Sequence, residues 1–255
     1  MSIYSVAPTT NSQEIPPINV LAIVAAGPER LGSLLNTWLG KPIERALIFD
    51  AASRDAPQMP GLNCEFSNAV LCEDESDKKA DLIRHSLPGL YSLRLPTNDL
   101  KEIFPGLTEI ERRSVPNLNF NALEERLELG SGTFKLLIDF PGEEYDLLTR
   151  LEKRGLLERA DAVRLRCGAE CYFEGAKPAS ELKDWLAERG FQLTHCDESD
   201  SAWPMLDFAA DRVNRRISAL ERDLADRDAA LEKAKAEATD TAKRLQDAQA
   251  QIKTA

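Results

Sequence analysis

The sequence predicts an α/β protein, built on a doubly wound, mostly parallel sheet and followed by a long C-terminal coiled coil. Short apolar runs of strand length alternate with segments whose apolar residues recur at helical spacing. One run, FKLLIDFPGEEYDLL from Phe134 to Leu148, passes directly from a buried strand into a helix. After about residue 206 the chain has no Gly or Pro, and apolar residues recur every three and four positions.

Composition sets limits on the class of protein. The chain has 255 residues, 43% of them hydrophobic, which suffices for one full core and an appended element. No apolar run approaches the roughly 20 residues that cross a bilayer, so we expect no membrane span. Residues 1–17 lack the basic and apolar regions of a secretion signal, and we interpret them as a flexible N-terminal arm of a cytoplasmic protein.

The net charge of −11 is unevenly distributed. From Asp211 onward the chain has ten Lys/Arg and nine Asp/Glu, which leaves 22 basic and 34 acidic residues in the part before it. An acidic globular part repels phosphate backbones, so we expect no nucleic-acid partner. The five cysteines contain no CxxC pair and read as free thiols. A zinc site from Cys167, Cys171, His195 and Cys196 matches no standard spacing, and we predict no metal.

The globular domain is predicted over residues 18–203 and opens with a strand, a tight turn and a helix. The run Ile18 to Ala26 has strand length, Gly27 begins the turn, and the apolar residues from Leu31 to Leu39 have helical spacing. A second strand ends in Asp50, about 20 residues after the turn, where dinucleotide-binding folds place a ribose ligand. Asp50 is equally explained as a helix cap or a solvated loop carboxylate, and both interpretations stay open.

The middle of the domain has weaker patterns. We predict a third strand over residues 64–72 with Asn68 near its end, a loop or short exposed helix over 73–84, helical turns over 97–104, an extended edge over 110–116 and a short helix over 118–127. The later elements are strands over 162–166 and from 191, with a helix over 180–189 between them.

The central run delivers an acidic residue to the carboxyl end of a strand. Asp139 ends the apolar stretch from Leu136, and Pro141-Gly142 breaks it before a helix that begins with Glu143 and Glu144. Ligands bind at this edge of open α/β sheets, and a buried carboxylate is costly without a partner, so we favour a functional role for Asp139. The two glutamates either serve the helix dipole or belong to the same site.

Residues 204–255 are predicted to form a coiled coil that begins at a Trp203-Pro204 hinge. One apolar row falls seven apart, at Ile217, Leu224, Leu231, Ala238, Leu245 and Ile252. The second row has Val213, Leu220, Ala234 and Ala248, with interruptions at Arg227 and Thr241. A stripe of period 3.5 pairs with another helix, so we expect a homo-oligomer or a partner helix. The alternative is a single long charged helix.

The order of these motifs resembles the FkbM-type family of S-adenosylmethionine-dependent methyltransferases. The family's fourth strand reads close to L-K-I-D-V-E-G-x-E-x-x-V-L, and residues 136–148 follow it as LLIDFPGEEYDLL. The resemblance extends back through Phe104-Pro105-Gly106 and forward through Tyr172-Phe173-Glu174-Gly175 and residues 186–191, LAERGF. It covers residues 19–194 and leaves the coiled coil outside.

The resemblance implies a class I methyltransferase sheet with S-adenosylmethionine over its first three strands. By that resemblance Asp139 and Glu144 would face the reacting methyl group and a sugar or other small-molecule acceptor. Cofactor contacts would come from Ala26, Gly27, Glu29, Asp50, Asn68 and Ala69.

The chain also departs from the family pattern. Ala25 and Glu29 stand in the first turn where glycines are usual, Leu137 replaces a Lys, and Arg164 and Arg166 lie in a strand where a Glu is common. A Glu in a turn that approaches a carboxylate-bearing ligand adds bulk and repulsion, so loss of cofactor affinity is expected. Three hypotheses follow: an active methyltransferase, a non-catalytic methyltransferase-like module joined to others by its coiled coil, or a scaffold whose coiled coil is the functional part.

Overall fold

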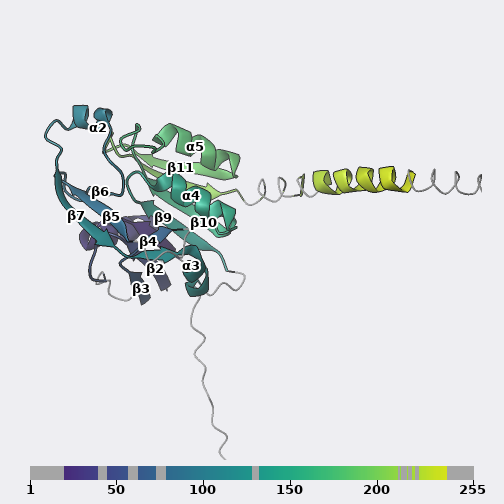
Figure 1. The fold of residues 1–255 in the computed structure, drawn as a ribbon, viewed down its shortest axis with the longest axis horizontal. Helices are drawn as coiled ribbons and strands as arrows, with labels where there is room; N and C mark the ends of the chain where they lie inside the picture. The colour runs from purple at the N-terminus through teal and green to yellow at the C-terminus, as the bar shows by residue number, and fades with distance from the viewer. Residues whose placement is uncertain are drawn as a thin grey trace, which may run out of the picture. The chain divides into compact units, whose positions relative to one another are not determined.

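The computed structural model describes residues 20–39, 45–56, 63–72, 79–127, 132–211, 213, 217, 220–221 and 224–239, and among these the side chains of 28, 29 and 36–39 lie outside the description. The chain divides into two compact units, Met1–Ala210 and Asp211–Ala255. We call them the α/β unit and the tail (Figure 1). The predicted arm over residues 1–17 lies outside the described residues.

The α/β unit is built on a seven-stranded sheet of order β11-β12-β10-β9-β1-β2-β3. Every neighbouring pair is parallel except the two that involve β12. The prediction of an α/β fold with a mostly parallel sheet is therefore confirmed. The strands are β1 (Val20–Val24), β2 (Arg45–Asp50), β3 (Asn63–Ser67), β9 (Phe134–Asp139), β10 (Ala160–Arg166), β11 (Phe191–Asp197) and β12 (Met205–Ala210).

Helices cover both faces of this sheet. On one face α1 (Pro28–Leu39) packs Leu31, Leu34 and Leu35 against alternate residues of β1. On the other face lie α3 (Phe120–Arg126), α4 (Glu144–Lys153) and α5 (Ala179–Glu188), with the 3-10 turn η1 (Leu157–Arg159) after α4. All five residues of β1 are buried, because a strand covered on both sides needs apolar residues facing both ways.

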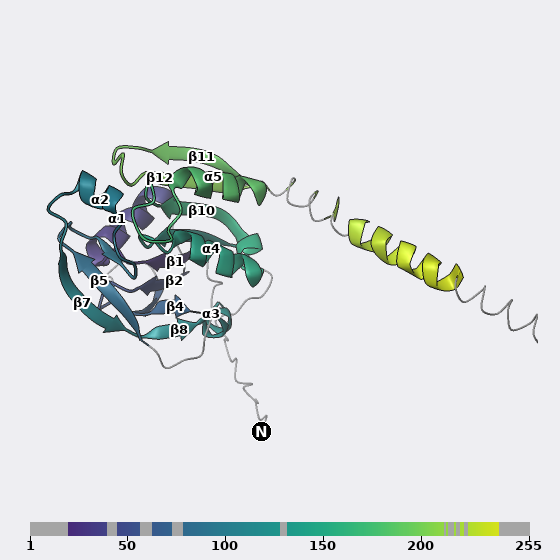
Figure 2. The same cartoon turned by 45° about the horizontal axis from the view of Figure 1, so that its top comes forward.

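Two smaller sheets accompany the main one. β5 (Ala80–His85) pairs antiparallel with β6 (Tyr91–Ser92) and β7 (Glu109–Val115), and β4 (Val70–Cys72) pairs parallel with β8 (Asn117–Asn119). Figure 2 shows β5 and β7 on the side of the unit where α2 (Asn98–Ile103) lies. The extended segment predicted over 110–116 and the helix over 118–127 are found as β7 and α3.

Two predictions about these smaller elements are wrong. The single strand expected over residues 64–72 is two strands, because β3 pairs with β2 whereas β4 pairs with β8. Residues 80–85, expected as a loop or short helix, form β5. β5 pairs with β7, which lies about 30 residues later in the chain, and three residues of β5 are buried: Leu82, Ile83 and His85. Local periodicity cannot reveal a strand that depends on so distant a partner.

The predicted domain boundary at residue 204 requires a correction. Residues 205–210 form β12, between β10 and β11. The pairing puts Arg164 opposite Asp207, and the guanidinium donates to both carboxylate oxygens at 2.6 and 2.7 Å. Trp203 is buried and packs against Phe104 and Tyr172, so it belongs to the core and not to a hinge.

The tail is helical over residues 224–239 and at the described positions 213, 217, 220 and 221. Its described heptad residues are largely exposed: Val213 70%, Ile217 45%, Leu220 50%, Leu224 61% and Leu231 52%. The rest of the predicted coiled coil, from residue 240 on, lies outside the described residues, and the pairing itself stays a prediction. No helix in the described part of the chain is long and apolar enough to cross a membrane.

Candidate functional site

The candidate site lies where β1 and β9 end side by side. Val24 pairs with Asp139 in the parallel register, and the Ala25 N–H donates to the Asp139 carbonyl at 2.8 Å. The strand order runs from β1 toward β2 in one direction and from β9 toward β10 in the other, which makes this edge the topological switch point of the sheet. Asp139 therefore lies beside the turn that carries Ala26 and Gly27, as the sequence predicted.

That turn depends on Gly27. Its φ is +78°, in the left-handed region that side chains with a Cβ rarely adopt. The turn leads directly into α1, and Ala26 is buried beside it. The side chain of Glu29, predicted to contact the cofactor, lies outside the described residues.

The Asp139 carboxylate is only 1% exposed and lies between two arginines. Arg30, in the first turn of α1, donates from Nη2 to Oδ1 at 3.1 Å and also lies 2.9 Å from Oδ2, although Oδ2 accepts no hydrogen bond. Arg166 Nη1 lies 3.8 Å from Oδ1 and its Nη2 binds Asp200 at 2.9 Å. Burial lowers the pKa of Arg30, and the charge of Asp139 opposes that shift. Two guanidinium groups thus cover the strand end.

Asp50 is fully buried at the end of β2, and its carboxylate accepts hydrogen bonds from the loop that follows. Its Oδ1 accepts from the Ala52 N–H at 2.9 Å, and its Oδ2 accepts from the Ser53 hydroxyl. Burial raises the pKa of Asp50, and hydrogen bonds from Ser53, Ala52 and the Ala26 N–H oppose the rise. Asp50 therefore binds groups of its own loop and is buried, not solvated, and its contact with a ribose stays a prediction.

Asn68 and Ala69 were predicted to lie beside the adenine of the cofactor, and Asn68 also binds the loop after β2. The Asn68 amide donates to the carbonyl oxygens of Asp50 at 3.0 Å and of Ala51 at 3.2 Å, and also to that of Ser53. Ala69 is buried. Arg113 reaches the same loop from β7 and donates to the Ala51 carbonyl at 2.8 Å. The end of β2 is therefore held by side chains from two other elements.

Glu144 is the second predicted catalytic residue, and it is only 2% exposed in the first turn of α4. Its Oε2 accepts from the Gly142 N–H at 2.9 Å, and Oε1 has no hydrogen-bond partner among the described residues. Burial raises its pKa to about 8, and the negative charge of Asp139 adds to the rise. Glu144 is therefore mostly protonated at neutral pH.

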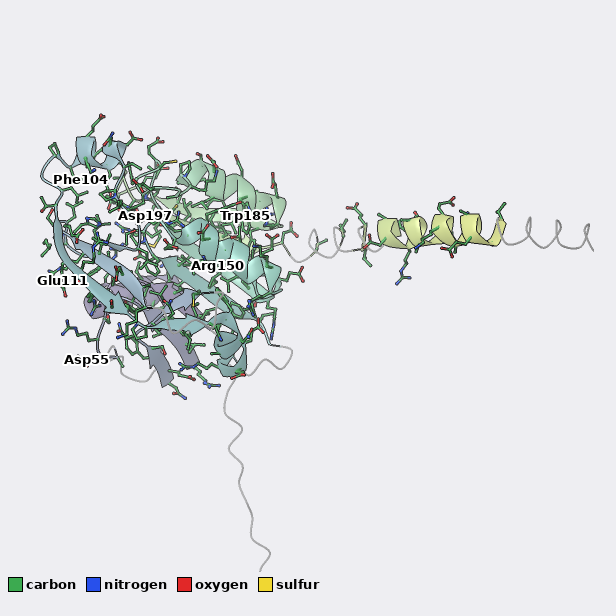
Figure 3. All side chains as sticks on the ribbon, viewed as in Figure 1. Asp55, Phe104, Glu111, Arg150, Trp185 and Asp197 are labelled. Atoms are coloured by element: carbon green, nitrogen blue, oxygen red, sulfur yellow. The ribbon has the colours of Figure 1, made fainter. Side chains whose placement is uncertain are left out.

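Residues 86–108, which we call the cap segment, join β5 to β7 and are bonded to the loop after β9. Ser92 Oγ donates to the Pro141 carbonyl at 2.7 Å. Arg94 contacts Glu143 and Asp146, each at 2.6 Å, and the Glu174 carbonyl at 3.0 Å. Phe104, labelled in Figure 3, stacks on Trp203 with ring centroids 5.8 Å apart. The cap segment is thus part of the packed unit.

Sequence reasoning missed the arginines that organise this site. Arg30 extends from Asp139 to the Gly89 carbonyl of the cap segment, at 3.4 Å. A cation in the first turn of a helix opposes the helix dipole, and that anomaly was a signal that Arg30 needs an acidic partner. Arg166 was noticed only as a departure from the family pattern. No comparable signal marked Arg94 or Arg113.

With these contacts in place, the site does not fit S-adenosylmethionine. The resemblance assigns Asp50, Asn68 and Asp139 to the cofactor or its methyl group, and each already binds groups of this chain. The sulfonium of the cofactor is a cation, and it would meet the guanidinium groups of Arg30 and Arg166. Within the described ranges no three His, Cys, Asp or Glu side chains cluster as a metal site.

Comparisons with protein-family models, with curated proteins and with solved structures gave no match to this chain. Its assignment therefore depends on the residues and contacts described above.

Proposed function

We propose that this chain is a non-catalytic, methyltransferase-like module whose tail joins copies of it together. The observation that carries the proposal is the Arg30–Asp139 contact, which fills the strand end where a methyl donor would react. The seven-stranded sheet, with β12 as its antiparallel strand, agrees with the class I methyltransferase sheet that the FkbM-type resemblance implies. The module would keep that scaffold and use its own side chains in place of the ligand.

The energetic cost of opening this site supports the proposal. Moving Arg30 away would leave the buried Asp139 with only Arg166, 3.8 Å away, as its cationic neighbour. Removing one partner of a buried ion pair costs about 3 kcal/mol. A cost of that size weakens any binding that requires the movement by more than about a hundredfold.

Titration with the cofactor tests the proposal. The full chain is expected to show no heat of binding and no rise in melting temperature with millimolar S-adenosylmethionine or S-adenosylhomocysteine. The measurements are isothermal calorimetry and thermal shift, with a known methyltransferase as positive control. A dissociation constant in the micromolar range, or cofactor carried through purification, would overturn the non-catalytic assignment.

An active methyltransferase is the second candidate, and Glu144 is the observation that favours it. Glu144 keeps its proton near neutral pH, and a carboxyl group in that state can orient an acceptor hydroxyl for reaction. This candidate requires Arg30 to leave Asp139 when the cofactor binds. It predicts that Arg30→Gln binds S-adenosylhomocysteine more tightly than the unaltered chain, whereas the non-catalytic module gains no such affinity.

Removal of the tail tests self-association. A chain ending at Ala210 keeps β12 and therefore the whole main sheet. We expect it to be a folded monomer by light scattering, whereas the full chain is expected to be an oligomer because its exposed heptad residues pair. A monomeric full chain at high concentration would contradict this part of the proposal.

A further inference from the structure

The described part of the tail carries an apolar stripe together with an ordered set of charges. Core positions of the heptad include Leu224 and Leu231, which are more than half exposed, and Ala234. Arg227 also occupies a core position. Asp228 and Lys235 occupy the flanking positions next to the core, on the same edge of the stripe. Flanking charges and polar core residues determine the orientation in which two helices pair.

We propose that two copies of this chain pair their tails antiparallel and in full overlap. This inference rests on the self-association proposed above and adds its geometry. In this alignment residue 231 of one copy lies opposite residue 234 of the other, and residue 227 lies opposite residue 238. The N-terminal ends of the two tails then lie at opposite ends of the pair.

The sizes of the core residues favour this alignment. Within the described helix, Leu231 meets Ala234 of the second copy, and Arg227 meets Ala238. Each of these two layers combines a large residue with a small one, so the two helices keep an even separation there. A parallel, in-register pair would instead place Arg227 against Arg227, and alanine against alanine at positions 234 and 238. The parallel core would carry like charges and poorly filled layers.

The flanking charges favour the same alignment. Asp228 lies beside Lys235 of the second copy, twice per pair, and the sequence adds a second attraction between Asp223 and Arg244. A parallel pair would place Asp223 beside Asp228, with Arg216 and Glu221 as its one attraction. An antiparallel pair displaced by one heptad would bring Asp228 against Asp228 or Lys235 against Lys235. Among these arrangements, full antiparallel overlap is the one without a like-charge contact between flanking residues.

Lys235 already has an acidic neighbour on its own helix. Its Nζ lies 2.8 Å from Glu232 Oε1, and both side chains are exposed. An exposed pair of this kind contributes little and rearranges readily. Lys235 is therefore available to Asp228 of the second copy.

A charge reversal at residue 228 tests the orientation, because its effect has opposite signs in the two alignments. In the antiparallel pair Asp228→Lys creates two like-charge contacts with Lys235, and we expect the dimer dissociation constant to rise about tenfold. In a parallel pair the same substitution removes the repulsion from Asp223 and tightens the dimer. The measurement is sedimentation equilibrium of the full chain over a range of concentrations.

Two further variants complete this experiment. Asp226→Lys makes the same charge change on the outer side of the helix and should leave the dissociation constant unchanged. The double variant Asp228→Lys with Lys235→Asp exchanges the two charges and should restore it. Tighter association of Asp228→Lys would overturn the antiparallel assignment but leave self-association intact. A full chain that is monomeric throughout would overturn both.

Cross-linking gives an independent measurement. A zero-length carbodiimide applied to mixed ¹⁴N and ¹⁵N chains should join Asp228 of one copy to Lys235 of the other, and mixed isotopes identify the bond as intermolecular. Within one helix these residues are about 10 Å apart along the axis, which is too far for a direct amide bond. Cross-linked dimers that lack the intermolecular 228–235 bond would contradict the antiparallel assignment.

Discussion

Replacing Arg30 with Gln is expected to lower the free energy of unfolding by about 3 kcal/mol, because the buried Asp139 side chain would lose its nearest cationic partner. Arg166 Nη1 is 3.8 Å from the carboxylate and also serves Asp200. For a unit of this size the melting temperature should fall by roughly 6 to 12 °C. Urea unfolding at neutral pH measures the free energy, and calorimetry measures the melting temperature.

A matched control is available on the surface of the same unit. Arg112 pairs with Glu109 at 2.8 Å, but both side chains are about two-fifths exposed. Arg112→Gln should therefore leave the free energy of unfolding nearly unchanged. The double variant Arg30→Gln with Asp139→Asn removes both charges of the buried pair and should recover most of the loss. Equal costs for Arg30→Gln and Arg112→Gln would show that the buried pair does not stabilise the strand end.

Glu144 is expected to make the α/β unit less stable as the pH rises. Its pKa is raised from 4.5 to about 8 by burial, so between these values the folded chain keeps a proton that the unfolded chain has released. The contribution of protonated Glu144 to the free energy of unfolding is fully present below pH 4.5 and is lost as the pH rises toward 8. The full effect corresponds to about 5 kcal/mol.

Glu144→Gln should remove this pH dependence, because the carboxamide resembles the protonated acid and can still accept from the Gly142 N–H. The variant should match the unaltered chain near pH 5 and exceed its stability by several kcal/mol near pH 9, on the order of the full effect. Urea unfolding of both proteins from pH 5 to 9 measures the difference, in which the other titrating groups cancel. Glu143→Gln is a useful contrast, since it removes the partner of Arg94 and should destabilise instead. A pH-independent difference for Glu144→Gln would contradict the proposed protonation.

The parts of the fold that local patterns encode were predictable. Residues 134–148 carry a buried strand, a Pro-Gly break and a helix in immediate succession, and the structure has β9 and α4 there. The position of Asp139 beside the first turn followed from the rule that parallel strands end at one edge. β5 and β12 were missed because distant partners bury them, and residues 205–210 were assigned to the tail because, like the tail, they contain no Gly or Pro.

The site itself was predicted in position but not in its interactions. Asp139 ends its strand and its charge contributes to the raised pKa of Glu144, yet sequence spacing could not show that Arg30 and Arg166 would converge on Asp139. These arginines lie 109 residues before and 27 residues after Asp139 in the chain, and only the folded sheet brings them together. The two arginines in the apolar run of β10 did carry information, since buried cations need acidic partners, here Asp207 for Arg164.

The position of β12 sets an order of events during synthesis. β12 lies between β10 and β11, so β11 has no neighbour to pair with until the chain has been made as far as residue 210. A nascent chain stopped before that point would present two open strand edges, which invite aggregation. The tail is translated after β12, so the residues that complete the main sheet are made before the tail.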